Sequence, residues 1–516
     1  MGDEDAAAAW LGQRPVISPL GNVVKFRPDL SRKNRLIQDL RASGVNAAST
    51  VHERQVLPRF ADHGHDIAAL AALGSSVGVF ILDFKHAFMT IPLAREEMPY
   101  NTSVVPESLT RTRPPLDDAE PSTGTVLVWR VLGFGGHANP LVYARIASFA
   151  CRSGQGLLQH ETAHSKIAHG RMQLYVDDPA VVLSGDLFQQ KEAIDVLVLW
   201  WLVLGIPLSW AKGSFQPADV PHTWIGVRFM LRQNFTIMSL PEEFLASLLS
   251  LAQKFADSKV RTAKMKEAQE LCGRVGRVGQ VVPEVKPFVS NLYGALAGSI
   301  RAAETRSREA APGSVATRRY RTSAQWLVHL LRQDGSAPLE LRSIVLPSAP
   351  SFDPQRFRVE FDASPWGGAA LLFEQGDLKE WFAIEWEDIE WLQIKIGESR
   401  HQTFWEFLVL TLAAVQWCPI YDELLFCGDN VASLQLALSH KGQGAIAIIG
   451  RELAWRKAKH LWQYAVAHLP AEANKLADRL SRLADPSFPP LASPPIELEG
   501  AARVHVHLDR LWSFKS

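Results

Sequence analysis

Runs of apolar residues in the first half of the chain predict strands that end at aspartates. The run "VGVFIL" at 77–82 is continuously apolar, as in a strand buried on both faces, and Asp83 follows it directly. The stretch "QLYVDDPAVVL" at 173–183 places Asp177 and Asp178 between two apolar segments, which predicts a hairpin with like charges at its bend. Such a pair is either a solvated turn, where aspartate is common, or a metal site whose cation compensates the charges.

The last third of the chain has a second succession of predicted strands and helices. In "RFRVEFDASPWGGAALLFEQGD" apolar and polar residues alternate with a period of two around Asp362, which predicts a strand. Two further strands follow, and "HQTFWEFLVLTLAAVQW" at 401–417 has the apolar spacing of a helix that carries Glu406. The segment "LLFCGDN" predicts a strand that ends at Asp429. A helical pair, the strand "WQYAVAHL" and a closing helix with Asp478 complete the order β-β-β-α-β-α-β-α.

The composition is that of a folded protein of about three domains. The chain has 516 residues, of which 47% are hydrophobic and 21% are charged. The formal net charge is zero, which by itself does not indicate a nucleic-acid-binding protein. The arginine-rich segment at 299–332 is either a solvated linker or a surface that follows phosphates.

Several segments mark boundaries or exclude other protein classes. Proline-rich stretches predict a surface loop at 106–124 and an extended tail at 485–500, and composition predicts linkers at 303–319 and 346–355. The apolar run at 196–208 is too short to span a bilayer, so we expect a buried helix that ends at a turn. The start of the chain lacks the apolar core of a secretion signal. The four cysteines are widely spaced, which argues against a structural zinc site and fits a reducing compartment.

Asp83 and the Asp177–Asp178 pair are the residues that would meet if the two predicted strand ends are adjacent. Magnesium prefers oxygen ligands and is often held by one or two carboxylates together with substrate phosphates. Asp83 with Asp177 would suit a two-metal centre. Taken alone, Asp83 could equally be a helix cap that follows a strand.

Several segments in the first part of the chain resemble the motifs of one protein family. The segments "LDFKHAFMTIPL", "VLGFGGHANPLVYAR", "LYVDD" and "LGIPLSWAKGSF" resemble, in this order, the palm motifs of retroelement reverse transcriptases. Upstream, "NRLIQDLRASGVN" resembles the fingers motif; downstream, "HTWIGVRF" resembles the primer grip and the segment 270–296 a helical thumb. The resemblance covers nearly all of 15–300.

The resemblance implies roles for individual residues. Asp83, Asp177 and Asp178 would be the catalytic, metal-binding carboxylates of the polymerase. The nucleotide-binding residues would be Arg35 at the triphosphate, Phe88 under the sugar, where its ring would exclude a 2′-hydroxyl, and Phe134 and Gly135 in the "GFGG" turn. Lys212 matches the lysine proposed to protonate the leaving pyrophosphate, although an exposed lysine at a strand end is an equal alternative.

The last third resembles a ribonuclease H domain of the retroelement type. Its element order is the ribonuclease H arrangement, and "HLPAEANKLAD" places His468 and Asn474 in the H-x5-N-x3-D frame of that family. Asp362, Glu406, Asp429 and Asp478 fit the four acidic positions, which could hold two metal ions, and His468 would assist product release or proton transfer. For each acid alone, a surface carboxylate is the common alternative.

Together these observations predict an α+β and α/β multidomain protein. The expected order is a right-hand polymerase, with fingers, palm and helical thumb, followed by a ribonuclease H-like domain with a five-stranded mixed sheet. The expected domains are fingers and palm at 15–238, a thumb-like helical region at 239–300, a linker or connection at 301–355, the ribonuclease H-like domain at 356–484 and a proline-rich tail at 485–516.

The resemblance implies an RNA-directed DNA polymerase from a retrotransposon of the DIRS type or of a Gypsy-like type. Its cofactors would be two Mg²⁺ ions per site, with Mn²⁺ as a substitute. Its partners would be an RNA template, a DNA primer, the RNA–DNA hybrid and deoxynucleoside triphosphates, with no membrane, in the cytoplasm or the nucleus. Two alternatives stay open: a descendant without catalysis that binds nucleic acid, and one that keeps only the nuclease.

Overall fold

The computed structural model describes most of the chain as two compact units. The first unit is Met1–Ile237 with Val345–Pro347, and the second is Met238–Ile344 with Ser348–Ser516. The described residues are 3–26, 32–105, 125–159, 169–233, 235–305, 310–332, 341–346, 356–387, 389, 392–488 and 495–511. The predicted loop at 106–124 therefore lies outside the described residues, as does nearly all of the predicted linker at 346–355.

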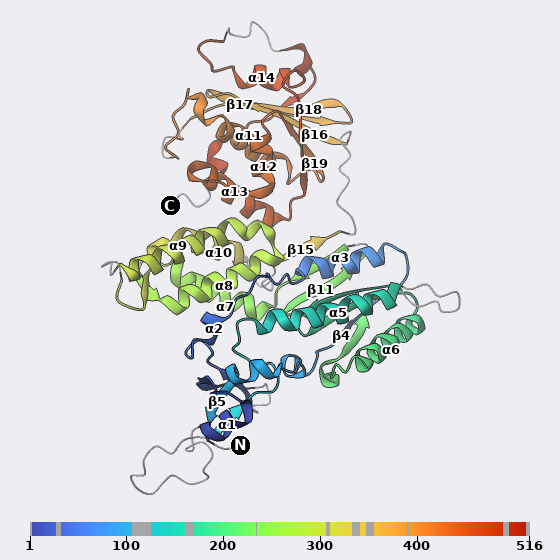
Figure 1. Ribbon diagram of the computed structural model, residues 1–516. Helices are drawn as coiled ribbons and strands as arrows, with labels where there is room; N and C mark the ends of the chain where they lie inside the picture. The colour runs from blue at the N-terminus through green and yellow to red at the C-terminus, as the bar shows by residue number, and fades with distance from the viewer. Residues whose placement is uncertain are drawn as a thin grey trace. The chain divides into compact units, whose positions relative to one another are not determined.

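The first unit combines a central four-stranded antiparallel sheet with helices, a three-stranded sheet, a two-stranded sheet and strands of a second four-stranded sheet (Figure 1). Its helices are α1 (Glu4–Leu11), α2 (Val45–Ala48), α3 (Phe60–Ala71), α5 (Asn139–Gln159) and α6 (Leu187–Val203). Its strands are β1 (Ile17–Ser18), β2 (Leu20–Phe26), β3 (Arg32–Gln38), β4 (Val77–Ile81), β5 (Thr102–Val105), β6 (Thr125–Val128), β7 (Gly170–Tyr175), β8 (Asp178–Ser184), β9 (Ser214–Pro217), β10 (His222–Trp224) and β11 (Val227–Arg232). The chain passes into the second unit within β12 (Phe235–Ser239).

The central sheet of the first unit has the strand order β7-β8-β4-β9. Strand β4 is the predicted apolar strand, and it pairs with β8 in the register Val77↔Ser184 to Ile81↔Ala180. Four consecutive residues of β8, from Ala180 to Leu183, are completely buried, which explains why this segment is apolar without alternation. The sheet therefore brings the end of β4 to the start of β8, where the candidate aspartates lie.

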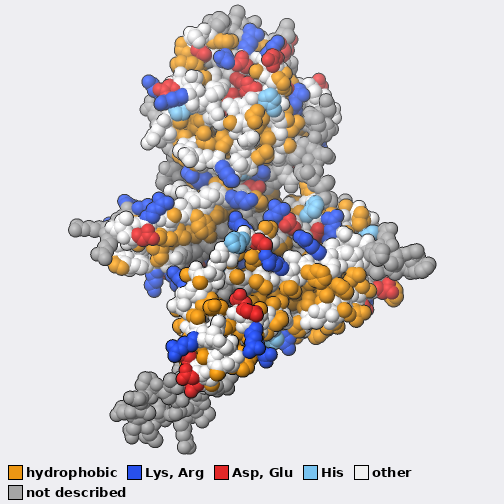
Figure 2. All heavy atoms as spheres, viewed as in Figure 1, with side chains coloured by type: hydrophobic (Ala, Val, Ile, Leu, Met, Phe, Trp, Pro, Cys, Tyr) orange, Lys and Arg blue, Asp and Glu red, His pale blue; other side chains and the backbone are white. Residues whose placement is uncertain are grey.

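Helix α6 is only half buried, so the predicted buried helix at 196–208 is wrong for one face. Asp186 caps the helix by accepting a hydrogen bond from Gln189 N, and the helix ends before Gly205. Leu197 and Trp201 are fully buried against the sheet, whereas Leu199 and Val203 are 62% and 69% exposed. Figure 2 shows hydrophobic side chains gathered where α5 and α6 lie. Apolar residues on every side of a helix predict complete burial, and here the outer face has no covering element among the described residues.

The second unit contains helices and a mixed sheet. Its helices are α7 (Glu242–Ala256), α8 (Met265–Val281), α9 (Lys286–Glu304), α10 (Arg321–Leu331), α11 (Gln402–Trp417), α12 (Val431–Ser439), α13 (Gly444–His460) and α14 (Lys475–Ser481). Its strands are β13 (Thr262–Lys264), β14 (Ser314–Ala316), β15 (Arg342–Val345), β16 (Phe357–Ala363), β17 (Gly367–Glu374), β18 (Asp377–Glu385), β19 (Leu424–Gly428), β20 (Tyr464–His468) and β21 (Ala502–Arg503). The segment expected to connect the domains thus includes α10, whose Trp326, Leu327 and Leu330 are buried.

The sheet of the second unit has six strands in the order β20-β19-β16-β17-β18-β21. The prediction of five strands missed β21, a two-residue strand that pairs parallel to β18 after the proline-rich segment. Strands β16, β17 and β18 are antiparallel, and β16, β19 and β20 are parallel. Parallel neighbours place their carboxyl ends at one edge of the sheet, so the ends of β16 and β19 carry Asp362 and Asp429 to the same place.

Two apolar cores hold helices on opposite faces of this sheet (Figure 1). Helix α11 is buried along almost its whole length and packs on one face together with α12 and α13. Helix α14 packs on the other face, where Ala477 and Leu480 meet Leu371. Because α11 is enclosed on all sides, Glu406 is carried into the interior, and its charge must be compensated there.

No helix in the described part of the chain is long and apolar enough to cross a membrane.

A buried histidine pair joins α3 to β10 in the first unit and makes a testable prediction about pH. The Nε2 atoms of His63 and His222 are 3.2 Å apart, and both rings are packed against Phe229. Burial lowers the pKa of His63 well below its usual value and lowers that of His222 to about 4. As the pH falls, these two histidines take up protons in the unfolded chain before they do so in the folded chain. Their contribution to stability should therefore be constant above about pH 7 and should decrease from about pH 6.5 downward.

We expect the free energy of unfolding to decrease by about 1.4 kcal/mol per pH unit for each imidazole that stays neutral in the folded state. The measurement is the thermal unfolding midpoint of the first unit within the full chain between pH 7.5 and 5. The double variant His63→Leu/His222→Leu should show a weaker pH dependence over this range. An unchanged dependence in that variant would show that the pair is not responsible.

Candidate active sites

The β7–β8 hairpin presents Asp177 and Asp178 at its bend. The pairing of Tyr175 with Asp178 leaves Val176 and Asp177 as the two turn residues. Val176 has a φ of 58°, which is unusual for a β-branched residue and matches the first position of a type II′ turn. Such a conformation costs on the order of 1–2 kcal/mol, so contacts outside the turn must hold it.

Main-chain hydrogen bonds place Asp83 beside this bend. Phe84 N donates to the carbonyl oxygen of Asp177 at 2.8 Å, and Leu82 N donates to that of Pro179 at 3.2 Å. Pro179 has no amide hydrogen to donate in return, so the pairing between β4 and β8 weakens where the aspartates begin. The structure thus brings together the three carboxylates that the sequence places almost a hundred residues apart.

Burial and neighbouring carboxylates raise the pKa of both aspartates at the bend. The pKa of Asp178 rises to about 6 because of burial and the charges of Asp177 and Asp83. Burial and Asp83 also raise the pKa of Asp177, while the cationic groups of Lys212 and Arg35 act in the opposite direction. The ammonium group of Lys212 forms an ion pair with the Asp83 carboxylate. Negative charge therefore exceeds positive charge at the bend, and a divalent cation would relieve the excess.

An aromatic cluster lies next to the aspartates. Phe88, in a short 3₁₀ helix over Ala87–Thr90, packs against Phe134 at 5.5 Å and Tyr143 at 5.2 Å between ring centroids. The guanidinium of Arg35, on β3, lies 5.6 Å from the centre of the Phe134 ring. Tyr143 is buried, and the carboxylates of all three aspartates raise its pKa. Sequence reasoning missed Tyr143, because its place in an apolar helical pattern indicates a core residue.

Gly135 is required where the "GFGG" turn meets β3. Its φ is 123°, and a Cβ atom there would lie 1.9 Å from the carbonyl oxygen of Gln38. Gln38 N donates to the carbonyl oxygen of Phe134, and Asn46 Nδ2 donates to that of Gly135 at 3.0 Å. Any side chain at Gly135 would separate the turn from β3, so this glycine fixes the position of Phe134 relative to Arg35.

In the second unit, Asp362, Glu406 and Asp429 converge. Each offers a carboxylate oxygen, and these oxygens all lie within 4.8 Å of one another. Asp362 comes from the end of β16, Glu406 from the first turns of α11, and Asp429 directly follows β19. Asp362 and Glu406 are 5% and 2% exposed. Three carboxylates this close and this buried are typical of a divalent metal site.

Hydrogen bonds orient the two buried carboxylates. Gln402 Nε2 donates to Glu406 Oε1 at 3.0 Å, and Ser481 Oγ lies 2.7 Å from Asp362 Oδ2. Glu406 Oε2 is buried and has no hydrogen-bond partner among the described residues. A buried carboxylate oxygen without a donor is costly, and a bound cation would satisfy it, so the residues present fit a metal ion. Gln402 and Ser481 were not predicted, because a polar residue on a helix carries no signal of its partner.

Asp478 and His468 lie at the border of this cluster. Asp478 is the first-turn acid of α14, and its Oδ1 accepts hydrogen bonds from the Arg482 guanidinium at 2.7 and 2.8 Å. Its charge still raises the pKa of Asp362. His468 is exposed at the end of β20, where it pairs with Gly428, the residue before Asp429. Asn474 is buried, and its Nδ2 donates to the carbonyl oxygen of Phe361 at 2.9 Å.

Burial and neighbouring carboxylates raise the pKa of two residues in this cluster. Burial is the main cause of the raised pKa of Asp362 and of the strongly raised pKa of Glu406, and neighbouring carboxylates add to it in both cases. The hydrogen bonds from Ser481 and Gln402 act in the opposite direction. Metal binding requires the ionised forms, so proton release and cation binding at this cluster are coupled.

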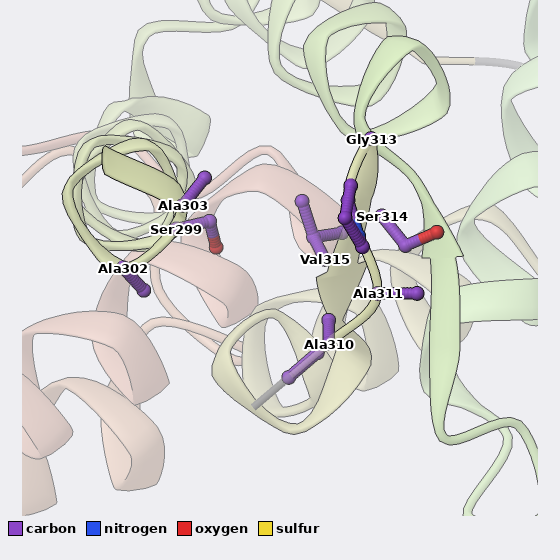
Figure 3. Close-up of a pocket in the computed structure, with 10 residues that line it drawn as sticks. Ser299, Ala302, Ala303, Ala310, Ala311, Gly313, Ser314 and Val315 are labelled. Carbon is purple, nitrogen blue, oxygen red and sulfur yellow. The ribbon is translucent and has the colours of Figure 1, made fainter. Parts of the chain in front are cut away.

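A separate cavity in the second unit has a different chemistry. Figure 3 shows the residues of α9 and of the segment 310–316 that line it. The volume of the cavity is about 410 Å³. Its walls are made of small and mostly apolar residues, namely Ser299, Ala302, Ala303, Ala310, Ala311, Pro312, Gly313, Ser314, Val315 and Ala316. None of these side chains is titratable, so this cavity offers none of the charged groups of the carboxylate sites.

One known family matches part of the first unit. The family described as Reverse transcriptase (RNA-dependent DNA polymerase) matches residues 21–229, which include the three aspartates and the aromatic cluster. No curated protein matches the chain in sequence.

Among solved structures, the chain is similar to the foamy viral protease-reverse transcriptase dRH in complex with double-stranded DNA. The identity is 14%, the similarity covers 94% of this chain and 69% of that chain, and the TM-score is 0.43. A foamy viral protease-reverse transcriptase in complex with an RNA/DNA hybrid is similar at 13% identity, over 96% of this chain and 57% of that chain, with a TM-score of 0.40.

The turn that carries Asp177 and Asp178 should depend on one indole hydrogen bond. Trp224 is buried, and its Nε1 donates to the carbonyl oxygen of Asp178 at 3.0 Å. Trp201 is equally buried, but its Nε1 has no hydrogen-bond partner among the described residues. Trp224→Phe and Trp201→Phe remove the same ring volume, so the difference between them isolates the hydrogen bond. We expect Trp224→Phe to lower the free energy of unfolding by about 1 kcal/mol more than Trp201→Phe does.

The measurement is amide hydrogen exchange along β7 and β8 together with the thermal unfolding midpoint. Faster exchange near Asp178 in Trp224→Phe alone would support the role of the bond. Equal exchange in both variants would contradict it.

Proposed function

We propose that the chain is the RNA-directed DNA polymerase of a retroelement. The proposal starts from the match of residues 21–229 to the reverse transcriptase family. We further propose that the second unit cleaves the RNA strand of RNA–DNA hybrids. The observation that carries the polymerase assignment is the meeting of Asp83 with Asp177 and Asp178 inside the matched segment. The convergence of Asp362, Glu406 and Asp429 supports the nuclease assignment.

The first site would join a nucleotide to a primer end. Asp83, Asp177 and Asp178 would hold Mg²⁺, and Asp362, Glu406, Asp429 and Asp478 would hold it in the second site. When bound, two Mg²⁺ ions lower the pKa of the attacking hydroxyl or water and stabilise the leaving oxygen. Lys212, which pairs with Asp83, is close enough to the carboxylates to deliver a proton to the departing pyrophosphate.

The aromatic cluster would select the sugar of the incoming nucleotide. Phe88 packs against Phe134 and Tyr143, and these contacts would oppose a movement of its ring away from a 2′-hydroxyl. Arg35 lies over Phe134 and would grip the triphosphate with its planar guanidinium. Deoxynucleoside triphosphates are therefore the proposed substrates, with an RNA template and a DNA primer as partners.

The second site would act on the product of the first. Copying RNA produces an RNA–DNA hybrid, whose backbone differs from that of DNA duplexes by the 2′-hydroxyl groups. His468, at the exposed end of β20 beside Gly428, would assist proton transfer or product release. Tethering both sites in one chain raises the local concentration of the hybrid at the nuclease. The proposed domain boundaries are those expected from the sequence, and the source would be a DIRS-type or Gypsy-like element.

Primer extension tests the polymerase assignment. On poly(rA)–oligo(dT) with Mg²⁺, the full chain should add nucleotides, and Asp177→Asn should reduce the rate about 10³-fold or more because a metal ligand is lost. Asp195→Asn, an exposed aspartate on α6, is the matched control and should extend as the unchanged chain does. Binding of the hybrid without Mg²⁺-dependent extension would instead support a descendant that only binds nucleic acid.

Cleavage of a labelled RNA–DNA hybrid tests the nuclease assignment. The RNA strand should be cut with Mg²⁺ by the full chain and by Asp177→Asn, and Asp429→Asn should reduce the rate about 10³-fold or more. Asp422→Asn, at the opposite end of β19, is the charge-matched control. Cleavage without any extension would favour a chain that keeps only the nuclease, and cleavage that survives Asp429→Asn would refute this site.

A further inference from the structure

Ser481 is a buried hydroxyl at the edge of the second carboxylate cluster. It is the last residue of α14, and it is 1% exposed. Its Oγ lies 2.7 Å from Asp362 Oδ2 and 2.9 Å from the carbonyl oxygen of Asp478. A hydroxyl has one proton to donate, and a carboxylate is the stronger acceptor, so the proton is directed to Asp362.

Two other side-chain hydrogen bonds at this junction end on the main chain. Ser364 Oγ donates to the carbonyl oxygen of Ser481 at 2.7 Å, and Asn474 Nδ2 donates to that of Phe361 at 2.9 Å. These bonds fasten α14 to β16 and the turn after it. The bond from Ser481 differs because its acceptor is the side chain of Asp362, which lies within the cluster of three carboxylates.

We propose that Ser481 is a positioning residue that fixes the rotation of the Asp362 carboxylate and so prepares the cluster for a divalent cation. The inference rests on the proposed function of this site as a metal-dependent nuclease. Asp362 lies close to two other carboxylates that repel it, and a rotation about its Cα–Cβ or Cβ–Cγ bond would relieve the repulsion. The Ser481 hydrogen bond opposes that rotation, as partners of metal-binding carboxylates do in general.

The role of Ser481 complements that of Gln402. Glu406 is held by Gln402 Nε2 and by the Ala363 amide, which is 3.4 Å from Glu406 Oε1. Donors on α11 and β16 thus orient one buried carboxylate, and a donor on α14 orients the other. Because α11 and α14 pack on opposite faces of the sheet, the cluster is fixed from both sides. Loss of Ser481 would free only Asp362.

Direct metal binding tests this role separately from catalysis. The full chain with Asp83→Asn and Asp177→Asn removes ligands of the first site, and Mn²⁺ binding is then followed by electron paramagnetic resonance. In this background we expect Ser481→Ala to raise the dissociation constant for Mn²⁺ about tenfold. Ser481→Thr, which keeps the hydroxyl, should stay within about threefold of the parent chain.

Ser364→Ala is the matched control, because it removes a buried hydroxyl from the same junction without removing a bond to a carboxylate. It should lower the thermal unfolding midpoint at least as much as Ser481→Ala does, because Ser364 Oγ also accepts hydrogen bonds from Trp366 N and Gly367 N. Mn²⁺ binding should stay within about threefold of the parent. In the chain with an intact first site, Ser481→Ala should raise the half-saturating Mg²⁺ concentration for hybrid cleavage and leave KM for the hybrid unchanged.

Three results would overturn the proposal, and they can be told apart. If the parent chain binds Mn²⁺ and Ser481→Ala binds it equally well, Ser481 does not position Asp362, and the nuclease assignment is unaffected. If Ser364→Ala weakens Mn²⁺ binding as much as Ser481→Ala does, the effect is a general loosening of the junction. If the folded parent chain binds no divalent cation at all, the proposed nuclease function fails, and this inference fails with it.

Discussion

Repulsion between carboxylates at partly buried strand ends is the constraint on which both candidate sites depend. Burial raises the pKa of Asp178 at the bend of β7 and β8 and that of Asp362 at the end of β16, and repulsion from neighbouring carboxylates adds to both shifts. Ionised carboxylates that are close together and removed from water destabilise a fold unless cations or donors compensate them. Much of the local architecture can be understood as the means by which the chain tolerates this repulsion.

The two sites compensate in different ways. At the first, the side chain of Lys212 supplies a full positive charge to Asp83, and the turn itself is strained at Val176 and held from outside by Trp224. At the second, neutral donors, Gln402 and Ser481, orient the buried carboxylates, and Glu406 Oε2 has no donor among the described residues. The three aspartates of the first cluster are half-buried, whereas Asp362 and Glu406 in the second are almost completely buried.

The hydrophobic cores explain why these groups stay in place. Helix α11 is buried on all sides, so Glu406 cannot turn to solvent, and α14 fixes Ser481 from the opposite face of the same sheet. In the first unit the fully buried segment of β8 anchors the hairpin next to β4. The outer face of α6 is apolar but exposed. An apolar sequence pattern predicts that a face will be buried, but it does not identify the element that buries it.

The sequence by itself determined the order of strands and helices in the last third, the strand that precedes Asp83 and the two strands around Asp177, because periodicity and turn residues are local properties. It did not determine β21, a two-residue strand that exists only by pairing with β18, nor the exposure of α6. Tyr143, Trp224 and Ser481 joined the sites only in the tertiary structure. A hydrogen bond or ring contact between residues far apart in the chain leaves no mark on either residue's neighbours, so only the folded arrangement could decide it.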